Sequence, residues 1–287
     1  MKKQIRVALS GGGFRFASHI GALAAIEEAG YEVIELAATS GGAIVAAMYA
    51  KGITIEQLKH IALTTNFEPM LSFNFDALLN FSFCNGNKLR TFLESIIGVN
   101  TEFWQLRVPL RVVASDIAIS KSFIFDKADD CVIQAIMASA AVPFLYSPVK
   151  INKQWLVDGG VTSNLPIELL TNDGVLKLGI KLSSRIDTTP IDSMFDIIGR
   201  TANLLFESNT NKNVDIGTMN KALFSMVDTG TIGSFDTKIS RQTREALFDR
   251  GYNATKLALE TFAKFTNGKR TLINYADINQ HIYGLEQ

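Results

Sequence analysis

The fold is decided by residues 4–42, which read QIRVALSGGGFRFASHIGALAAIEEAGYEVIELAATSGG. Two β-type runs, residues 4–10 and 31–37, are each followed by a glycine-rich turn or a helix signal, and helical runs follow at residues 14–29 and 43–50. Strands that alternate with helices at this spacing favour a mostly parallel sheet covered by helices. We therefore predict a three-layer α/β/α fold with a mostly parallel central sheet.

The same alternation continues through the middle of the chain. Predicted strands cover residues 109–116, 122–126, 154–157 and 175–182, and predicted helices cover residues 54–63, 88–97 and 130–141. Thr54 and Gln57 have the spacing of a capping box at the start of one of these helices. Residues 66–86 break the alternation, because they are rich in phenylalanine and carry few charges.

The last third of the chain is mainly helical. Thr189 and Pro190 are predicted as the N-cap and the first residue of a helix. Its apolar face would comprise Ile191, Met194, Phe195, Ile198, Ala202 and Leu205. A longer helix is predicted at residues 240–265. We predict one domain, with an α/β core in residues 1–185 and a mainly helical C-terminal part in residues 186–287.

Composition excludes several classes of protein. The chain has 287 residues, and 28 basic residues balance 28 acidic ones, which argues against a nucleic-acid partner held mainly by phosphate contacts. Two cysteines, Cys84 and Cys131, and three histidines predict neither a disulfide framework nor a metal site. The apolar run after the basic start is too short for a signal peptide, so we expect a cytoplasmic protein. The uncharged residues 131–149 contain Pro143 and Pro148, which favours a helix broken by proline over a membrane span.

Three glycines, Gly11, Gly12 and Gly13, stand between the first strand and the first helix. Their amides face no side chain and lie at a helix N-terminus, which is typical of an anion site. The anion could be the oxyanion of an acyl-transfer intermediate or a dinucleotide pyrophosphate. In a dinucleotide site the third glycine of G-x-G-x-x-G would stand where this chain has Phe16, and Glu32 stands roughly where a ribose-binding acid would be.

A second turn, Ala38-Thr39-Ser40-Gly41-Gly42, places a serine between a strand and a helix. A serine on such a turn presents its hydroxyl clear of the backbone, and small neighbours are needed because backbone segments come close. The usual form of this elbow is G-x-S-x-G, and alanine replaces its first glycine here. The alternative interpretation is a serine that only caps the helix.

A third turn, Asp158-Gly159-Gly160, directly follows a predicted strand. An aspartate at the carboxyl end of a strand points toward the site edge of a parallel sheet. The alternative is an ordinary Asp-Gly turn, which is common.

The histidines test whether a third group assists the serine. Ser40, Asp158 and His281 have the chain order of an α/β-hydrolase triad, but only two predicted strands precede Ser40. His19 lies within the first predicted helix and His281 lacks a surrounding signature, so packing or surface roles are favoured for both. The serine would then rely on Asp158 directly.

The three turns, in this order, resemble the patatin-like phospholipase family. Residues 11–15 (GGGFR) are similar to its oxyanion loop, residues 38–42 (ATSGG) to its nucleophile elbow, and residues 158–160 (DGG) to its catalytic aspartate turn. Residues 164–166 (NLP) continue as the family does. The resemblance extends from about residue 5 to residue 182.

The resemblance implies a patatin-like serine acyl hydrolase that needs no metal or organic cofactor. Asp158 would accept the proton of Ser40 as the serine attacks an acyl ester. The implied oxyanion hole comprises Gly11, Gly12 and Gly13 with Arg15 nearby, and the implied elbow comprises Ala38, Gly41 and Gly42. The family's substrates are phospholipids, lysophospholipids and other acyl lipids.

Alternatives stay open beside this interpretation. Phe16 and Ala38 stand where the family usually has glycine, which leaves room for a catalytically weak relative that binds lipid or another protein. The other two alternatives are a nucleotide-binding α/β protein and a hydrolase with a catalytic triad through His281. The phenylalanine-rich residues 67–83 and the apolar face from Ile191 to Leu205 are the candidates for lipid contact at a membrane surface. The C-terminal helices could also serve homo-oligomer formation.

Overall fold

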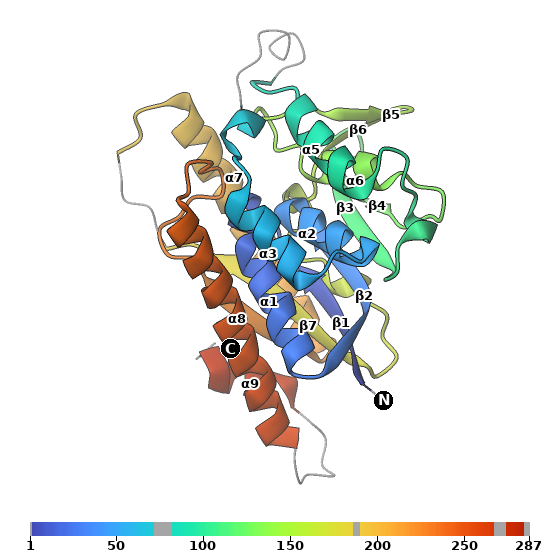
Figure 1. Cartoon of the computed structure of the whole chain (residues 1–287), viewed down its shortest axis with the longest axis vertical. Helices are drawn as coiled ribbons and strands as arrows, with labels where there is room; N and C mark the ends of the chain where they lie inside the picture. The colour runs from blue at the N-terminus through green and yellow to red at the C-terminus, as the bar shows by residue number, and fades with distance from the viewer. Residues whose placement is uncertain (1, 72–81, 186–189, 267–273, 284–287) are drawn as a thin grey trace.

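A computed structural model describes residues 2–71, 82–185, 190–266 and 274–283 (Figure 1). These residues form one eight-stranded sheet with the strand order β5-β6-β3-β2-β1-β7-β8, and β4 also pairs with β3. The parallel strands are β1 (Lys3–Leu9), β2 (Tyr31–Thr39), β3 (Leu110–Asp116), β7 (Leu176–Ser183) and β8 (Ala222–Asp228). The antiparallel strands are β4 (Lys121–Phe125), β5 (Val149–Ile151) and β6 (Gln154–Asp158). The predicted mostly parallel sheet is confirmed.

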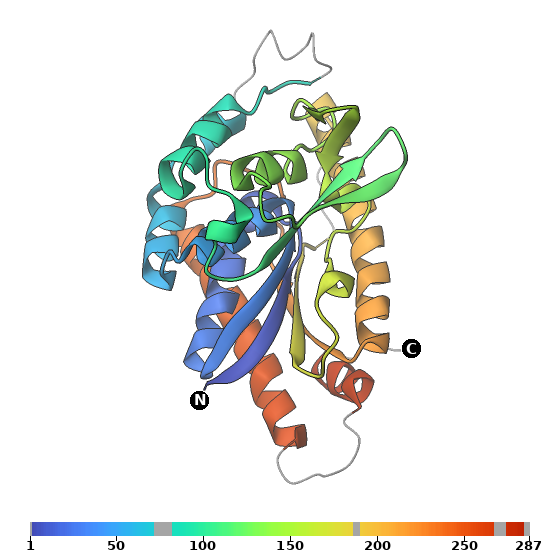
Figure 2. The same ribbon diagram turned by 90° about the vertical axis from the view of Figure 1, so that its right-hand side faces the viewer.

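Helices cover both faces of this sheet, as the edge-on view shows (Figure 2). One side carries α1 (Ala17–Glu28), α2 (Ser40–Lys51), α3 (Ile55–Thr64), α5 (Asn87–Ile97), α6 (Val132–Ser139) and α8 (Arg241–Thr266). The other side carries α7 (Met194–Met219). The predicted α/β/α layers are therefore present, and the capping box of Thr54 and Gln57 at the start of α3 is confirmed.

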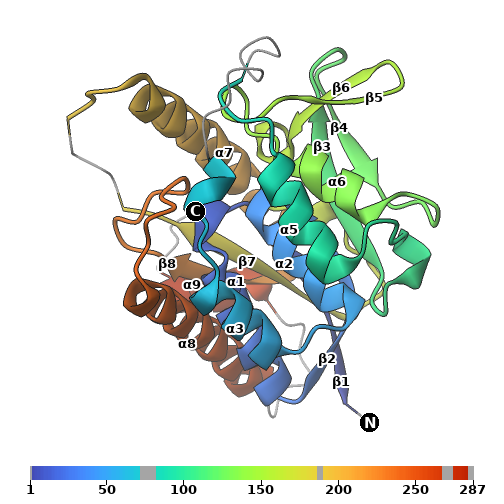
Figure 3. The ribbon, with the colours of Figure 1, turned by 45° about the horizontal axis from the view of Figure 1, so that its top comes forward.

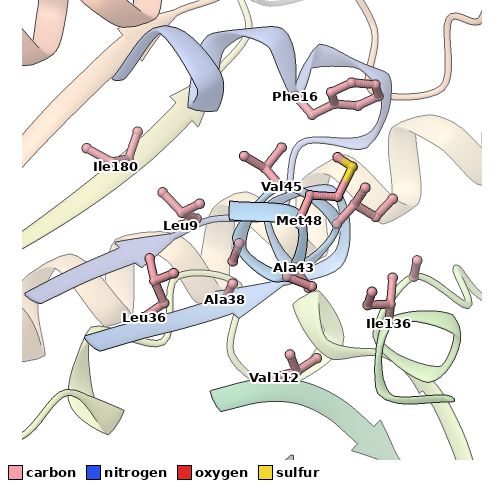
Figure 4. Packing of buried hydrophobic residues seen from close by; sticks show 14 of the residues in the cluster. Leu9, Phe16, Leu36, Ala38, Ala43, Val45, Met48, Val112, Ile136 and Ile180 are labelled. Atoms are coloured by element: carbon pink, nitrogen blue, oxygen red, sulfur yellow. The ribbon is translucent and has the colours of Figure 1, made fainter. Parts of the chain in front are cut away.

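Alternate residues of the central strands bury opposite faces. Leu9 and Leu36 point into the large cluster beneath α1, α2 and α6 (Figure 4), whereas Ala8 and Ala37 belong to the smaller cluster that includes Val214 of α7. A strand segment buried on both faces is apolar throughout, which is why residues 7–9 of β1 and 36–38 of β2 are continuous apolar runs. Because both faces of these strands are buried, polar groups gather in the turns that follow the carboxyl ends of the strands.

The C-terminal part differs from the prediction in two respects. The helix predicted from Thr189 and Pro190 begins later, at Met194, because Ser193 and Asp196 form a capping box there; Pro190 is not helical, and Thr189 lies outside the described residues. The mainly helical part also adds β8 to the sheet, a strand that the sequence analysis did not predict. No helix in the described part of the chain has the length and apolar character needed to cross a membrane.

The free edge of β8 is covered by α9 (Tyr275–Tyr283) rather than by another strand. Asn279 donates its side-chain N–H to Ala222 O and accepts the amide of Phe224, both at 3.1 Å. The hydroxyl of Tyr283 accepts the amide of Met226 and donates to Phe224 O, also at 3.1 Å. Two side chains thus satisfy backbone groups that would otherwise invite pairing with another chain.

Candidate active site

Ser40 is the first residue of α2 and directly follows β2, which ends at Thr39; Figure 3 shows both elements with the top of the molecule turned forward. Its φ is +52°, a left-handed value that a non-glycine residue adopts only at a cost of about 1–3 kcal/mol. The side chain is buried, and its backbone N–H donates to Ser139 Oγ at 2.8 Å. A strained turn of this kind between a strand and a helix is the geometry that a nucleophile elbow requires.

Asp158 meets the hydroxyl of Ser40. Ser40 Oγ donates to Asp158 Oδ2 at 2.6 Å, and the amide of Gly160 donates to Asp158 Oδ1 at 2.8 Å. Asp158 has no exposed surface. The two side chains that sequence reasoning paired across more than a hundred residues are therefore in direct contact.

The register of the sheet explains this contact, and it corrects one step of the sequence argument. That argument treated Asp158 as the end of a parallel strand, but β6 runs antiparallel to β3. Asp158 pairs with Ala114, while Thr39 pairs with Val113 on the other side of β3. Asp158 and the residue after Thr39 consequently reach the same level of the sheet from opposite directions.

Burial changes the acidity of Asp158. Removal from water raises its pKa to about 7, although the hydrogen bonds from Ser40 and Gly160 act in the opposite direction. Desolvation disfavours the charged carboxylate, whereas donated hydrogen bonds favour it. A carboxyl group with a pKa near neutrality is suited to take up and release a proton in a reaction.

The elbow and the glycine loop touch each other through backbone atoms. A Cβ on Gly41 would lie 2.5 Å from Gly13 O, and a Cβ on Gly42 would lie 2.4 Å from Ser10 O. Any side chain at either position would collide with backbone that cannot move aside. These glycines are therefore required by close approach, as the sequence analysis expected of the turn.

The amides of the glycine loop are not equivalent. Gly11 N donates to Asn164 O at 3.0 Å and Phe14 N donates to Ser234 O at 2.9 Å. Within the described residues, no acceptor faces the amides of Gly12 and Gly13. Of the three predicted oxyanion-hole glycines, Gly11 therefore has its amide already engaged, whereas the Gly13 amide is without such a partner in the described part of the chain and lies against the turn that carries Ser40.

Arg15 lies behind this loop. Its side chain is buried and donates to Gly12 O at 3.1 Å, Thr229 Oγ1 at 3.0 Å and Ser234 Oγ at 2.8 Å. Burial lowers the pKa of Arg15 to about 10, so the guanidinium remains charged at neutral pH. Sequence reasoning placed Arg15 beside the oxyanion; the geometry instead directs these donors to the loop that surrounds it.

An apolar cavity of about 40 Å³ adjoins Ser40. Its walls are mostly hydrophobic and come from Gly13, Phe14, Phe16, Ser40, Gly41, Ile44, Phe67, Met70, Leu89, Phe92, Ala140, Val142, Tyr146 and Phe235. A space of this size holds no more than a few waters. An apolar ligand of any length would therefore have to displace wall side chains or extend through the mouth.

The two departures from the family pattern are accommodated. Phe16 packs edge-on against Phe67 with ring centroids 5.1 Å apart, so it forms part of the cavity wall. Ala38 lies in β2, where it pairs with Leu9 and Val112 within the hydrophobic core (Figure 4).

No histidine in the described residues contacts the Ser40–Asp158 pair. His19 is buried and its Nε2 donates to Ser10 O at 2.7 Å, and burial lowers its pKa to about 3. His281 is exposed on α9 and its ring meets Phe265 at 5.3 Å. The triad alternative through His281 finds no support in this geometry.

The dinucleotide alternative also lacks support. Glu32, the candidate ribose ligand, is exposed and pairs with Gln4 at the beginning of β1. The glycine loop follows the other end of β1, after Leu9. Glu32 therefore lies at the amino ends of the strands and the glycine loop at their carboxyl ends. A dinucleotide site needs both features at the carboxyl ends. The described part of the chain also contains no group of three or more His, Cys, Asp or Glu side chains placed to hold a metal ion.

Sequence reasoning missed the contribution of α7. Asn209 donates to Gly160 O at 2.9 Å and to Val161 O at 2.8 Å, which holds the turn after Asp158. Asn164 donates to Thr210 Oγ1 at 2.7 Å. The only sequence signal for these contacts was a run of polar residues on one face of α7. In the structure this face packs on the sheet.

A protein-family model and several known proteins match this chain. The model of the family described as patatin-like phospholipase matches residues 7–171. An uncharacterized NTE family protein of Mycobacterium tuberculosis is 29% identical over 164 residues, which are 57% of this chain and 44% of that protein. The uncharacterized protein YqhO of Bacillus subtilis is 23% identical over 284 residues, covering 88% of this chain and 96% of YqhO. This chain thus spans less than half the length of the mycobacterial relative.

Solved structures share the fold. VipD from Legionella pneumophila superposes with a TM-score of 0.63 at 16% identity, over 91% of this chain and 67% of VipD. The type III effector protein ExoU superposes with a TM-score of 0.52 at 13% identity, over 91% of this chain and 53% of ExoU. Since the family model matches more than half of its residues, the chain belongs to the patatin-like phospholipase family.

Proposed function

We propose that this protein is a serine acyl hydrolase that cleaves fatty-acyl esters of lipids, with Ser40 as nucleophile and Asp158 as general base. The observation that carries the proposal is the 2.6 Å hydrogen bond from Ser40 Oγ to Asp158 Oδ2 at a strained turn. Membership of the family supports a lipid acyl hydrolase in general terms. The dyad and the class of lipid are our inference from the site.

The reaction follows from the positions of these groups. As Ser40 Oγ bonds to the acyl carbon, its proton passes to Asp158, and the carbonyl oxygen takes up the negative charge. The free amides of Gly12 and Gly13 would donate to this oxygen. Collapse of the intermediate breaks the ester bond, and Asp158 returns the proton to the departing alcohol. Water then attacks the acyl-serine with Asp158 again accepting the proton, which restores Ser40 and releases the fatty acid.

The cavity beside Ser40 supports an apolar acyl group as substrate. Its wall combines phenylalanines with aliphatic side chains, and Phe16, Phe67 and Phe92 form part of it. An acyl chain in this space would be removed from water, which is favourable at about 0.8 kcal/mol per buried methylene. Because the cavity holds only about 40 Å³, an acyl chain would have to displace these side chains or extend through the cavity mouth.

The outward face of α7 is our candidate for contact with a lipid surface. The sequence analysis took one apolar face from Ile191 to Leu205, but the structure divides it: Ala202 is buried against the sheet, whereas Met194 and Leu204 are 62% and 74% exposed. Of the other candidate, residues 67–83, Phe67 is buried in the cavity wall, and Phe73 and Phe75 lie outside the described residues.

Several large apolar side chains share the exposed face of the first half of α7: Met194, Ile197, Leu204 and Leu205. An exposed apolar stripe of this kind marks an interaction surface more often than a solvated one. We place this face against the headgroup region of a membrane, as a peripheral contact.

Replacing Met194 and Leu204 together by aspartate is expected to weaken binding to phospholipid vesicles at least about 10-fold, because each apolar side chain contributes about 1.5–3 kcal/mol when fully buried. Co-sedimentation with vesicles measures the effect. The matched control is the double replacement of Met219 and Leu257 by aspartate, since both side chains are exposed on helices away from this face. Equal losses in the two doubles, or none in either, would refute the assignment of the face.

Hydrolysis of acyl esters tests the proposed function directly. Purified protein would be incubated with short p-nitrophenyl esters and with phospholipid vesicles carrying labelled acyl chains, and released acid would be measured. We expect acid release from both. A folded protein that binds vesicles but releases no acid would favour the catalytically weak lipid-binding module, and stabilisation by NAD in a thermal shift assay would favour the nucleotide-binding alternative.

A further inference from the structure

The buried guanidinium of Arg15 is held by neutral partners from the C-terminal part of the chain. Its Nη2 donates to Ser234 Oγ at 2.8 Å, and Ser234 Oγ in turn donates to Asn203 Oδ1 at 2.9 Å. Its Nη1 donates to Thr229 Oγ1 at 3.0 Å. In the described residues no salt bridge within 4 Å joins Arg15 to a carboxylate, although a longer-range Coulombic interaction with Glu207 raises the pKa of Arg15. A buried charge without a direct ion pair is costly and persists only when its hydrogen bonds are well satisfied.

These contacts end at one peptide bond of the glycine loop. Arg15 Nε donates to Gly12 O at 3.1 Å, and the Gly12 carbonyl belongs to the same planar peptide unit as the Gly13 N–H. In a trans peptide the C=O and N–H point in opposite directions. A guanidinium that holds the carbonyl from behind therefore aims the Gly13 amide forward, toward the turn that carries Ser40.

Ser234 holds the same loop through its backbone as well. Its carbonyl accepts the amide of Phe14 at 2.9 Å, and a Cβ on Gly13 would lie 1.9 Å from that carbonyl oxygen. Gly13 has a φ of +56°, which favours glycine for a second reason. Gly13 is thus held between two contacts: Arg15 binds the carbonyl of the preceding peptide, and Ser234 binds the N–H of the following one.

Arg15 lies within the part of the chain that matches the family model, but the side chains that hold its guanidinium do not. The match covers residues 7–171, whereas Asn203 lies on α7, and Thr229 and Ser234 lie between β8 and α8. The family motifs supply the loop, but a different segment supplies the contacts that orient it. That division suggests a specific task for this segment beyond packing.

We propose that Ser234 and Asn203 are positioning residues, which act through Arg15 to orient the Gly12–Gly13 peptide as an oxyanion donor. The chain of hydrogen bonds runs from Asn203 through Ser234 and Arg15 to the carbonyl of Gly12. This inference rests on the proposed function in that the oriented amide serves an acyl intermediate. The orientation of the loop itself can be tested without any turnover.

The test compares Ser234→Ala with Ser225→Ala. Both remove a buried serine hydroxyl; the Ser225 hydroxyl bonds to Thr255 between β8 and α8, away from the site. Hydrogen exchange of the segment containing the Phe14 and Arg15 amides is measured by mass spectrometry. We expect Ser234→Ala to accelerate exchange there and Ser225→Ala to leave it unchanged. Unchanged exchange in Ser234→Ala would overturn the proposal, whether or not the protein shows activity.

Kinetics with a soluble ester provide the second measurement. We expect Ser234→Ala to lower kcat about 10-fold with little change in KM, since a misdirected donor weakens transition-state binding more than substrate binding; loss of an oxyanion donor outright costs about 100- to 1000-fold. Asn203→Ala should give a similar loss, and Asn203→Asp, which keeps the acceptor oxygen, should retain activity. A loss confined to KM, or equal losses in Ser234→Ala and Ser225→Ala, would contradict the positioning role.

The two measurements separate this inference from the proposed function. If the wild type releases no acid but Ser234→Ala still loosens the glycine loop, the acyl hydrolase assignment fails and the positioning contacts stand. If the wild type is active and Ser234→Ala matches it in exchange and in kcat, the positioning role fails alone.

Discussion

Ser40→Ala is expected to abolish acyl ester hydrolysis, with a loss in kcat/KM of about 10⁴-fold or more, because removal of a serine nucleophile removes the covalent route altogether. The hydroxyl that is lost is the only one within hydrogen-bonding distance of Asp158 Oδ2 in the described residues. Alanine keeps the Cβ at a position with a φ of +52°, so the turn itself should survive. Release of fatty acid from labelled vesicles and from a short ester measures the loss.

Two comparisons decide what the Ser40→Ala result means. His281→Ala should retain wild-type activity, since His281 lies on α9 against Phe265 and away from the elbow. Thermal unfolding of each variant shows whether it is folded. A folded Ser40→Ala protein with more than about a tenth of wild-type activity would be inconsistent with a role as nucleophile, because residues outside the covalent route cause smaller losses.

Asp158→Asn is expected to lower kcat/KM by about 10²- to 10⁴-fold, the range that a general base contributes. An amide cannot take the proton of Ser40.

In the wild type, the pKa of about 7 for Asp158 predicts that kcat/KM rises with pH and levels off above neutrality, because only the ionised carboxylate can act as base. A profile measured between pH 5 and 9 would contradict this assignment if it were flat below pH 7.

The same pKa of Asp158 predicts that the stability of the folded protein falls as the pH rises, whereas its activity increases. The folded protein raises the pKa of Asp158 from 3.8 to about 7, so the folded state holds this proton more tightly than the unfolded state. The resulting stabilisation is fully present below about pH 4 and is lost as the pH rises through about 7. Relative to Asp158→Asn, the free energy of unfolding of the wild type should fall by about 4 kcal/mol over this interval.

Denaturant unfolding of both proteins at several pH values between 4 and 8 measures this difference. The asparagine variant is its own control, because all other titrating groups are shared. If Asp158→Asn loses activity yet is more stable than the wild type above pH 7, the Asp158 carboxylate serves the chemistry rather than folding. A constant difference across the pH range would show that burial does not perturb Asp158.

Local sequence patterns were sufficient for most of the fold. The alternation of apolar runs with helical periodicity predicted β1, β2 and the helices after them, because each depends on side chains a few residues apart. The turn carrying Ser40 was predictable for the same reason: a serine followed by two glycines between a strand and a helix admits few conformations. β8 was missed, since the short apolar run of residues 222–228 does not by itself distinguish a buried strand from a helix segment.

The sequence by itself therefore determined the layers of the fold and the sharp turn at Ser40, and its resemblance to a family pointed to Asp158 as the partner of Ser40. Only the tertiary structure decided which glycine amides remain free, which way Arg15 points and how acidic Asp158 is. Arg15 bonds to Thr229 and Ser234, more than 200 positions away. The physical reason is that local conformation depends on near neighbours, whereas desolvation and hydrogen-bond partners depend on segments that meet only when the whole chain packs.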